Sequence, residues 1–101
     1  MAKRPLLPRQ EKALQAFGEN LRYARLRRDL SMEQIAERSG ISRYTLDRIE
    51  KGEEGVAMGH YFRVLLALGL ESDLLLVAKD DKLGRRLQDA KLEPRERASK
   101  K

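Results

Sequence analysis

Hydrophobic side chains recur every three or four residues over the first third of the chain. The positions that share this spacing are Leu14, Phe17, Leu21 and Ala24. A period of this length puts them on one face of a helix, so the pattern predicts a first helix from about Gln10 that Asp29 and Leu30 close. Residues 1–9 hold two prolines and three basic side chains without a periodic pattern, and we predict a flexible basic arm there.

Two short helices with clear start and stop signals are predicted next. Ser31 followed by Gln34 is a capping box, in which each side chain bonds the backbone of the other residue. Gly40 can end that helix in a left-handed conformation. Ser42 is the expected cap of the following helix, which Gly52 ends. Two short helices joined by a tight turn that contains glycine are the signature of a helix-turn-helix motif.

The hydrophobic pattern becomes denser after this motif. A largely buried fourth helix is predicted to end at Gly69. A fifth, short helix is predicted from Ser72 or Asp73 to about Lys79, and it contains the apolar run 74–77. A helix that is apolar all round needs cover on both sides, and in a domain of this size a second subunit is one source of that cover.

The end of the chain is more polar. Residues 81–92 are compatible with a short sixth helix that carries Leu83 and Leu87 on one side, whereas residues 93–101 predict a disordered basic tail. The helical domain is predicted over 10–80. The fold class is therefore all-α, with five helices, this short C-terminal helix and flexible basic termini. The residues expected in dimer or partner contact are Leu74, Leu75, Leu76, Val77, Leu83 and Leu87.

Composition and charge narrow the chemistry. The chain has 22 Lys and Arg against 16 Asp and Glu, a formal charge of +6, which favours polyanions as partners. Residues 1–28 hold eight basic and two acidic side chains, whereas residues 29–57 hold four basic and seven acidic ones. With no cysteine and one histidine, no metal site, cofactor or cysteine nucleophile is expected.

Enzymes and membrane proteins are the classes least expected. The acidic pairs at 53–54 and 80–81 lie in predicted polar loops, without a nearby nucleophile or base. The longest apolar run, residues 64–68, is far shorter than the roughly 20 residues that cross a bilayer. No export signal follows the basic N-terminus, so we expect a cytoplasmic protein.

The centre of the chain resembles a known family of regulators. Residues 21–52, which read LRYARLRRDLSMEQIAERSGISRYTLDRIEKG, are similar to the Cro/C1 (XRE) family of helix-turn-helix regulators, and the similarity extends through LLALGL at 65–70. This resemblance implies a five-helix all-α domain that binds double-stranded DNA. From Gly52 onward the sequence is similar to HipB-like antitoxins, which implies a HipA-type kinase toxin as partner. The residues that carry this second resemblance are GEEGVAMGHYFRVLLALGLESDLLLVAKDD and LGRRLQDAKLEPRER.

The resemblance to Cro/C1 regulators places the recognition helix at Ser42–Glu50. Residues expected to contact bases are Arg43, Tyr44, Asp47 and Arg48, and a guanidinium can bond O6 and N7 of guanine together. Residues expected to contact the DNA backbone are Ser31, Gln34, Ser42, Thr45 and Arg22. Arg25 and Glu50 stand where family members often pair an arginine of the first helix with a glutamate late in the third, which implies a partly buried structural ion pair. Met32 stands where the family commonly has glutamine, so we expect Gln34 to take part of that role.

The leading functional interpretation is a sequence-specific DNA-binding repressor that acts as the antitoxin component of a HipA-like toxin–antitoxin operon. We expect a homodimer, because it would place two recognition helices about 34 Å apart on a palindromic operator. One alternative is a stand-alone phage-type or general XRE-family regulator. Another is an interaction module that neutralises a partner through its fifth helix and basic tail, with DNA binding incidental.

Overall fold

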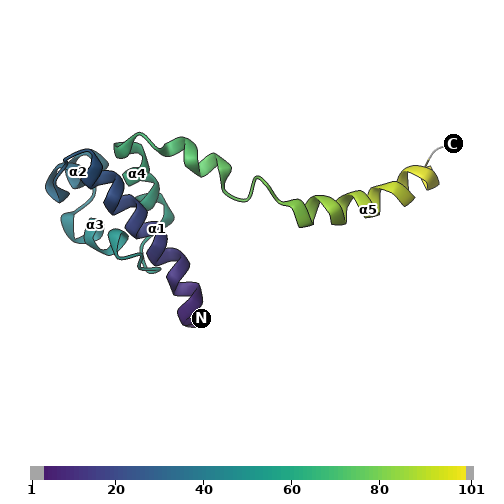
Figure 1. Ribbon diagram of the computed structural model, residues 1–101, viewed down its shortest axis with the longest axis horizontal. Coiled ribbons are helices and arrows are strands. Elements are labelled where there is room, and N and C mark those ends of the chain that lie inside the picture. Colours follow the sequence, from purple (N-terminus) through teal and green to yellow (C-terminus); the bar gives the residue numbers. More distant parts are fainter. Residues whose placement is uncertain (1–3, 100–101) are drawn as a thin grey trace.

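The computed structural model describes residues 4–99 and is all-helical. Over this range it has six helices and no strand, which confirms the predicted fold class. They are α1 (Pro8–Arg27), α2 (Met32–Ser39), α3 (Arg43–Glu50), α4 (Met58–Leu68), the 3-10 helix η1 (Glu71–Leu76) and α5 (Lys82–Ser99). The first five form one body, whereas α5 lies apart from it at the end of an extended connection (Figure 1).

The first helix begins earlier than the sequence pattern indicates. Pro8 is the first residue of α1, where its fixed φ suits a helix and its missing N–H costs nothing. The Oε1 atom of Gln10 accepts a hydrogen bond from the N–H of Leu7 at 2.9 Å, which satisfies one of the free backbone donors at this end. α1 therefore includes Pro8 and Arg9, which the sequence pattern assigns to the arm, and residues 1–3 lie outside the described residues.

The two helices of the predicted motif have the expected caps. The Ser31 Oγ accepts from the backbone N–H of Gln34 at 3.1 Å, and the Gln34 side chain accepts from the N–H of Ser31 at 2.8 Å. Gly40 ends α2 with φ of +69°. The Ser42 Oγ caps α3 by accepting from the N–H of Thr45 at 3.0 Å. Local sequence signals therefore define both helices and the turn between them.

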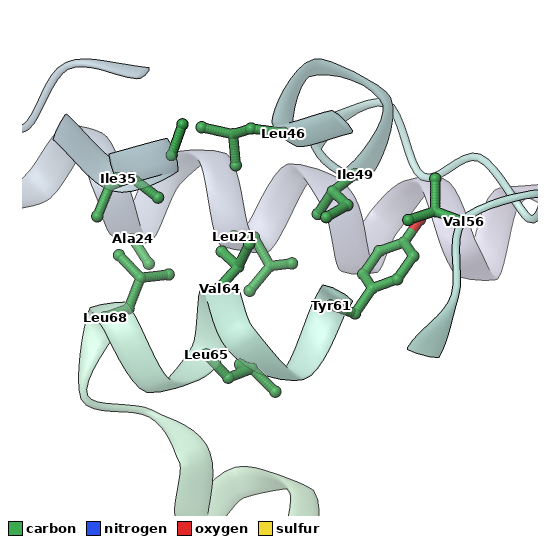
Figure 2. Packing of buried hydrophobic residues seen from close by; sticks show 11 residues of the cluster. Leu21, Ala24, Ile35, Leu46, Ile49, Val56, Tyr61, Val64, Leu65 and Leu68 are labelled. Atoms are coloured by element: carbon green, nitrogen blue, oxygen red, sulfur yellow. The ribbon is translucent and has the colours of Figure 1, made fainter. Parts of the chain in front are cut away.

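One hydrophobic core joins α1, α2, α3 and α4. Side chains from all four helices point toward one another in Figure 2. The most deeply buried of them are Ile35, Leu46, Ile49 and Val64. The α2–α3 motif contributes one apolar face to this core and leaves its other face to solvent, which is how an amphipathic helix pair is held on a small domain.

Two glycines allow α1 to cross very close to the end of α3. A Cβ atom on Gly18 would lie 2.5 Å from the carbonyl oxygen of Ile49 and 2.6 Å from the amide nitrogen of Gly52. Gly52 also has φ of +70°, a conformation that side chains other than glycine adopt at a cost. The position of α3 on the body is thus fixed by backbone contact.

The C-terminal part differs most from the sequence prediction. The fifth helix is a short 3-10 helix that ends at Leu76, and Leu75 is 76% exposed. Leu76 and Val77 are exposed as well, so the described residues do not supply the cover that the apolar run led us to expect. Of the four apolar residues 74–77, Leu74 packs against the core.

The last helix is longer than predicted. α5 continues to Ser99, past the predicted boundary at residue 92. Asp81 caps this helix by accepting from the N–H of Gly84 at 3.0 Å. Residues 93–99 include glutamate, arginine and alanine, which are good helix formers, and one proline, which is a poor one. Lys100 and Lys101 lie outside the described residues.

Candidate nucleic-acid interface

The N-terminal ends of α2 and α3 lie side by side on the exposed face of the motif. Arg43, the first residue of α3, forms an ion pair of 3.0 Å with Glu33 in the first turn of α2. Both side chains are about two-thirds exposed, at 64% and 65%. We call this face, made by the first turns of α2 and α3, the motif face. Free N–H groups at two neighbouring helix starts attract anions, so the face suits a phosphate backbone.

Tyr44 stands out from this face. Its side chain is 71% exposed although it is large and partly apolar. The tyrosine ring lies 5.8 Å from the guanidinium carbon of Arg48, one turn further along α3. An exposed aromatic ring stacked on an arginine has no role in the core, whereas both groups are suited to contacts with bases and phosphates.

Arg48 is held more firmly than Arg43. Its Nε donates to the Glu53 Oε1 at 3.0 Å, and its side chain is 29% exposed. A Cβ atom at Gly55 would lie 2.8 Å from the Nη2 of Arg48, so glycine leaves space for the guanidinium there. Neither Glu53 nor Gly55 was predicted from the sequence to be part of this site. The only sequence signal is Gly52, which permits the turn that brings the loop back to α3.

Asp47 has an ion-pair partner one turn along α3. Its Oδ2 lies 2.9 Å from the Nζ of Lys51. The hydrogen bond from Lys51 to Asp47, together with the negative charge of that carboxylate, raises the pKa of Lys51 above its ordinary value. Three of the residues expected to contact bases are charged: Arg43, Asp47 and Arg48. Each of them forms an ion pair within the chain.

The residues expected at the DNA backbone divide into caps and one arginine. Ser31, Gln34, Ser42 and Thr45 bond within their own helix starts, and the hydroxyls of Ser42 and Thr45 lie 3.0 Å apart. Arg22 lies on α1, with its guanidinium carbon 5.8 Å from the ring of its neighbour Tyr23. The caps are brought together on the motif face. Met32 is half-buried and packs against the hydrophobic core.

A buried ion pair fixes the far end of α3. The Arg25 Nε donates to Glu50 Oε2 at 2.7 Å and its Nη2 donates to Glu50 Oε1 at 3.0 Å. A third bond runs from Arg25 Nη1 to the carbonyl of Leu30 at 2.9 Å. The side chains are only 9% and 6% exposed. The hydrogen bonds to Glu50 raise the pKa of Arg25, and the charged pair ties α1 to α3.

The loop between α3 and α4 is anchored by Tyr61. Its hydroxyl donates to the backbone carbonyl of Glu53 at 2.7 Å, and its ring stacks on Phe17 with centroids 5.4 Å apart. Burial raises the pKa of Tyr61, and the nearby carboxylate of Glu53 adds to the shift. The loop that carries Glu53 is therefore attached to the core and not only to α3.

These features define a class of protein: two capped helices that meet at a tight turn, with the second exposed along its outer face, form a helix-turn-helix DNA-binding module. A family model described as a helix-turn-helix domain matches residues 16–76. The chain belongs to this family of helix-turn-helix domains. The match ends at the last residue of η1, so α5 lies beyond it. No curated protein matches the chain.

No helix within residues 4–99 combines the length and the apolar character that a membrane span requires.

Proposed function

We propose that this protein is a sequence-specific DNA-binding repressor whose helix α3 enters the major groove. The observation that carries the proposal is the exposed outer side of α3, with Arg43 and Tyr44 at its start, beside the capped start of α2. In helix-turn-helix proteins these helix starts meet the duplex. Arg43, Tyr44, Asp47 and Arg48 are the proposed base contacts. Ser31, Gln34, Ser42, Thr45 and Arg22 are the proposed contacts to the DNA backbone.

The chemistry of these side chains supports different roles. An arginine that bonds guanine at two acceptors contributes about 1–3 kcal/mol of discrimination against the wrong base. Serine and threonine at helix caps bond phosphates and fix the register of the protein on DNA without recognising sequence. The acidic centre of the chain is compatible with this proposal, because Glu33 and Glu53 pair with arginines of the same face.

The test is DNA binding by single variants at one fixed salt concentration. The probe is the duplex that the wild-type chain enriches from a pool with a randomised centre. Arg43→Ala and Arg48→Ala should each weaken binding to it by about 5- to 150-fold. Arg38→Ala, in the last turn of α2, removes the same charge away from the motif face and is the control. Equal affinities for the two variants and the control would overturn the proposal.

We further propose that two copies form a homodimer through η1 and α5. Leu75, Leu76 and Val77 are exposed at the end of η1, and Leu83 and Leu87 are exposed on α5. Residues 75–77 are three successive exposed apolar side chains, and an exposed apolar patch is a mark of protein contact. A two-fold dimer would present two copies of α3 and select a palindromic operator. The remaining proposed contact residue, Leu74, is half-buried in its own domain.

Sedimentation of two α5 variants tests the dimer. Leu87→Glu puts a charge on the apolar side of α5 and should convert the dimer to a monomer. Gln88→Glu adds the same charge at the next position and should leave the dimer intact. A wild-type monomer, or identical masses for the wild type and both variants, would contradict the proposed interface.

The more specific proposal is an antitoxin role in a HipA-like operon, in the cytoplasm. It rests on the sequence resemblance from Gly52 onward, and α5 supports it as a basic helix with exposed leucines outside the family domain. Co-expression with the product of the neighbouring gene is the test. A kinase-type partner should co-purify with the full chain and not with a chain that lacks residues 82–101. Elution of the chain as its own dimer would instead favour a stand-alone regulator.

A further inference from the structure

Arg48 and Glu53 form a small structured site at the C-terminal end of the exposed side of α3. They are bonded twice: the Arg48 Nε donates to Glu53 Oε1 at 3.0 Å, and the Glu53 N–H donates to the Arg48 carbonyl at 3.1 Å. The guanidinium also lies against the ring of Tyr44. Within residues 4–99, neither Nη atom of Arg48 makes a hydrogen bond, and the side chain is 29% exposed.

Several neighbouring residues keep Glu53 in place. The positive φ of Gly52 turns the chain back toward α3. The Tyr61 hydroxyl then holds the Glu53 carbonyl at 2.7 Å, and Tyr61 is itself buried. The backbone of Glu53 is thus fixed by the core, which distinguishes this pair from an ion pair between two residues on freely moving segments.

Arginine has a long side chain, and ordering it on binding costs conformational entropy. When a carboxylate already holds the Nε and an aromatic ring covers one side of the guanidinium, part of that ordering precedes binding. A preorganised donor loses less on forming its bonds and discriminates better between correct and incorrect geometry. The Glu53 carboxylate also opposes phosphate, so its charge lowers affinity for any DNA backbone.

We propose that Glu53 is a positioning residue for base recognition, which holds Arg48 for contact with one base pair and so determines specificity at that position. This inference rests on the proposed function, because it requires Arg48 to contact a base. Its consequence is an unusual pair of effects. Loss of the Glu53 carboxylate should weaken binding to the preferred duplex and strengthen binding to unrelated DNA.

The neighbouring glutamate provides a matched control. Glu53→Ala and Glu54→Ala remove the same charge from adjacent positions of the loop, but only Glu53 pairs with Arg48. Each variant is measured on the duplex that the wild-type chain selects and on a duplex of scrambled sequence, at one salt concentration. Glu54→Ala should change both affinities in the same direction and leave their ratio within about twofold. Glu53→Ala should lower that ratio about tenfold, given the cost of ordering an arginine side chain.

A second variant disturbs the same guanidinium without changing charge. In Gly55→Ala the new Cβ would lie 2.8 Å from Arg48 Nη2, a flexible atom that can move away. This variant should also lower the ratio, and the loss for both variants should be confined to the base pair at which Arg48→Ala loses discrimination. Gly55→Ala keeps the test valid if Glu53→Ala does not fold.

The outcomes separate this inference from the proposal on which it rests. If Arg48→Ala leaves the ratio unchanged, Arg48 does not contact a base and the base-recognition assignment fails. If Arg48→Ala lowers the ratio while Glu53→Ala behaves like Glu54→Ala and Gly55→Ala behaves like the wild type, Arg48 recognises its base without Glu53 and the inference is overturned.

Discussion

At its C-terminal end α3 is fixed to α1 by buried groups, whereas at its N-terminal end it is exposed to solvent. One arginine–glutamate pair from each end shows the difference. Arg25 and Glu50 are almost completely buried and joined by two hydrogen bonds, whereas Arg43 and Glu33 are mostly exposed. The same two residue types therefore have different roles. The buried pair orients the helix, and the exposed pair can separate when a ligand with stronger charge approaches.

The energetic reason for this difference is solvation. A buried charge that loses its partner is left in a medium of low polarity, which costs far more than the pair contributed. An exposed charge that loses its partner returns to water, so an exposed pair contributes little to stability. A DNA-binding helix benefits from both arrangements, because its frame should be rigid and its contact groups should be free to exchange partners.

The largest effect is expected at the buried end. Glu50→Ala leaves the Arg25 guanidinium buried without its carboxylate and should lower the free energy of unfolding by about 3–5 kcal/mol. Urea unfolding followed by circular dichroism measures this change. Glu33→Ala, which removes the glutamate of the exposed pair, should cost less than about 1 kcal/mol. Similar losses for the two variants would remove the distinction between the two ends.

Gly18 tests the backbone contact at the same end. In Gly18→Ala the added Cβ would collide with the backbone at Ile49 and Gly52, which cannot yield as a side chain can. The free energy of unfolding should fall by at least about 1–3 kcal/mol. Gly59→Ala is the matched control in α4, since a Cβ there meets nothing within 4 Å. That variant should gain about 0.4–1 kcal/mol, because alanine restricts the unfolded chain. A stable Gly18→Ala protein would show that α1 and α3 can move apart easily.

Much of the fold was predictable because its signals are local. Ser31 with Gln34, and the glycine at residue 40, act on backbone groups within a few residues of themselves, so their sequence order determines where α2 begins and ends. The exposure of residues 75–77 was not predictable in this way. Periodicity shows that an apolar run needs cover, but not whether the same chain provides it.

In the candidate site, too, the sequence predicts some residues and not others. The register of α3 leaves Arg43 exposed and Arg48 partly exposed, and the sequence resemblance was sufficient to propose both as base contacts. Their partners were missed, because each pairing depends on the path of the chain through a turn. Glu33 is ten residues before Arg43, and Glu53 returns to Arg48 only through the conformation of Gly52. The contacts of these residues with DNA stay a prediction.

A smaller effect is expected from the anchor of the α3–α4 loop. Tyr61→Phe removes the hydrogen bond to the Glu53 carbonyl and should cost about 0.5–1.5 kcal/mol at neutral pH. Burial raises the pKa of Tyr61, so the unfolded chain ionises first, at its ordinary value of about 10. The ionisation of Tyr61 therefore leaves the free energy of unfolding unchanged below about pH 10. Above that pH the free energy of unfolding falls, until the pH reaches the raised pKa of the folded state.

The difference in the free energy of unfolding between wild type and Tyr61→Phe separates the effect of Tyr61 from that of other groups that titrate in alkali. Urea unfolding of wild type and Tyr61→Phe should give curves that are parallel below about pH 10 and converge above it. Parallel curves throughout would mean that the pKa of Tyr61 is the same in the folded and unfolded chains.

The smallest effect is expected at the exposed end of α3. A double-mutant cycle of Glu33→Ala and Arg43→Ala should give a coupling energy of about 0.2–1 kcal/mol in dilute buffer, because water and mobile ions screen both groups. The coupling should fall further as salt is added, since the Debye length shrinks to about 3 Å at 1 M. Thermal unfolding of the four proteins at two salt concentrations measures it. A coupling above about 2 kcal/mol that resists salt would exceed the usual value for exposed pairs. It would mean that Arg43 is as firmly held as Arg25, and the two ends of α3 would no longer differ in the way that groove recognition requires.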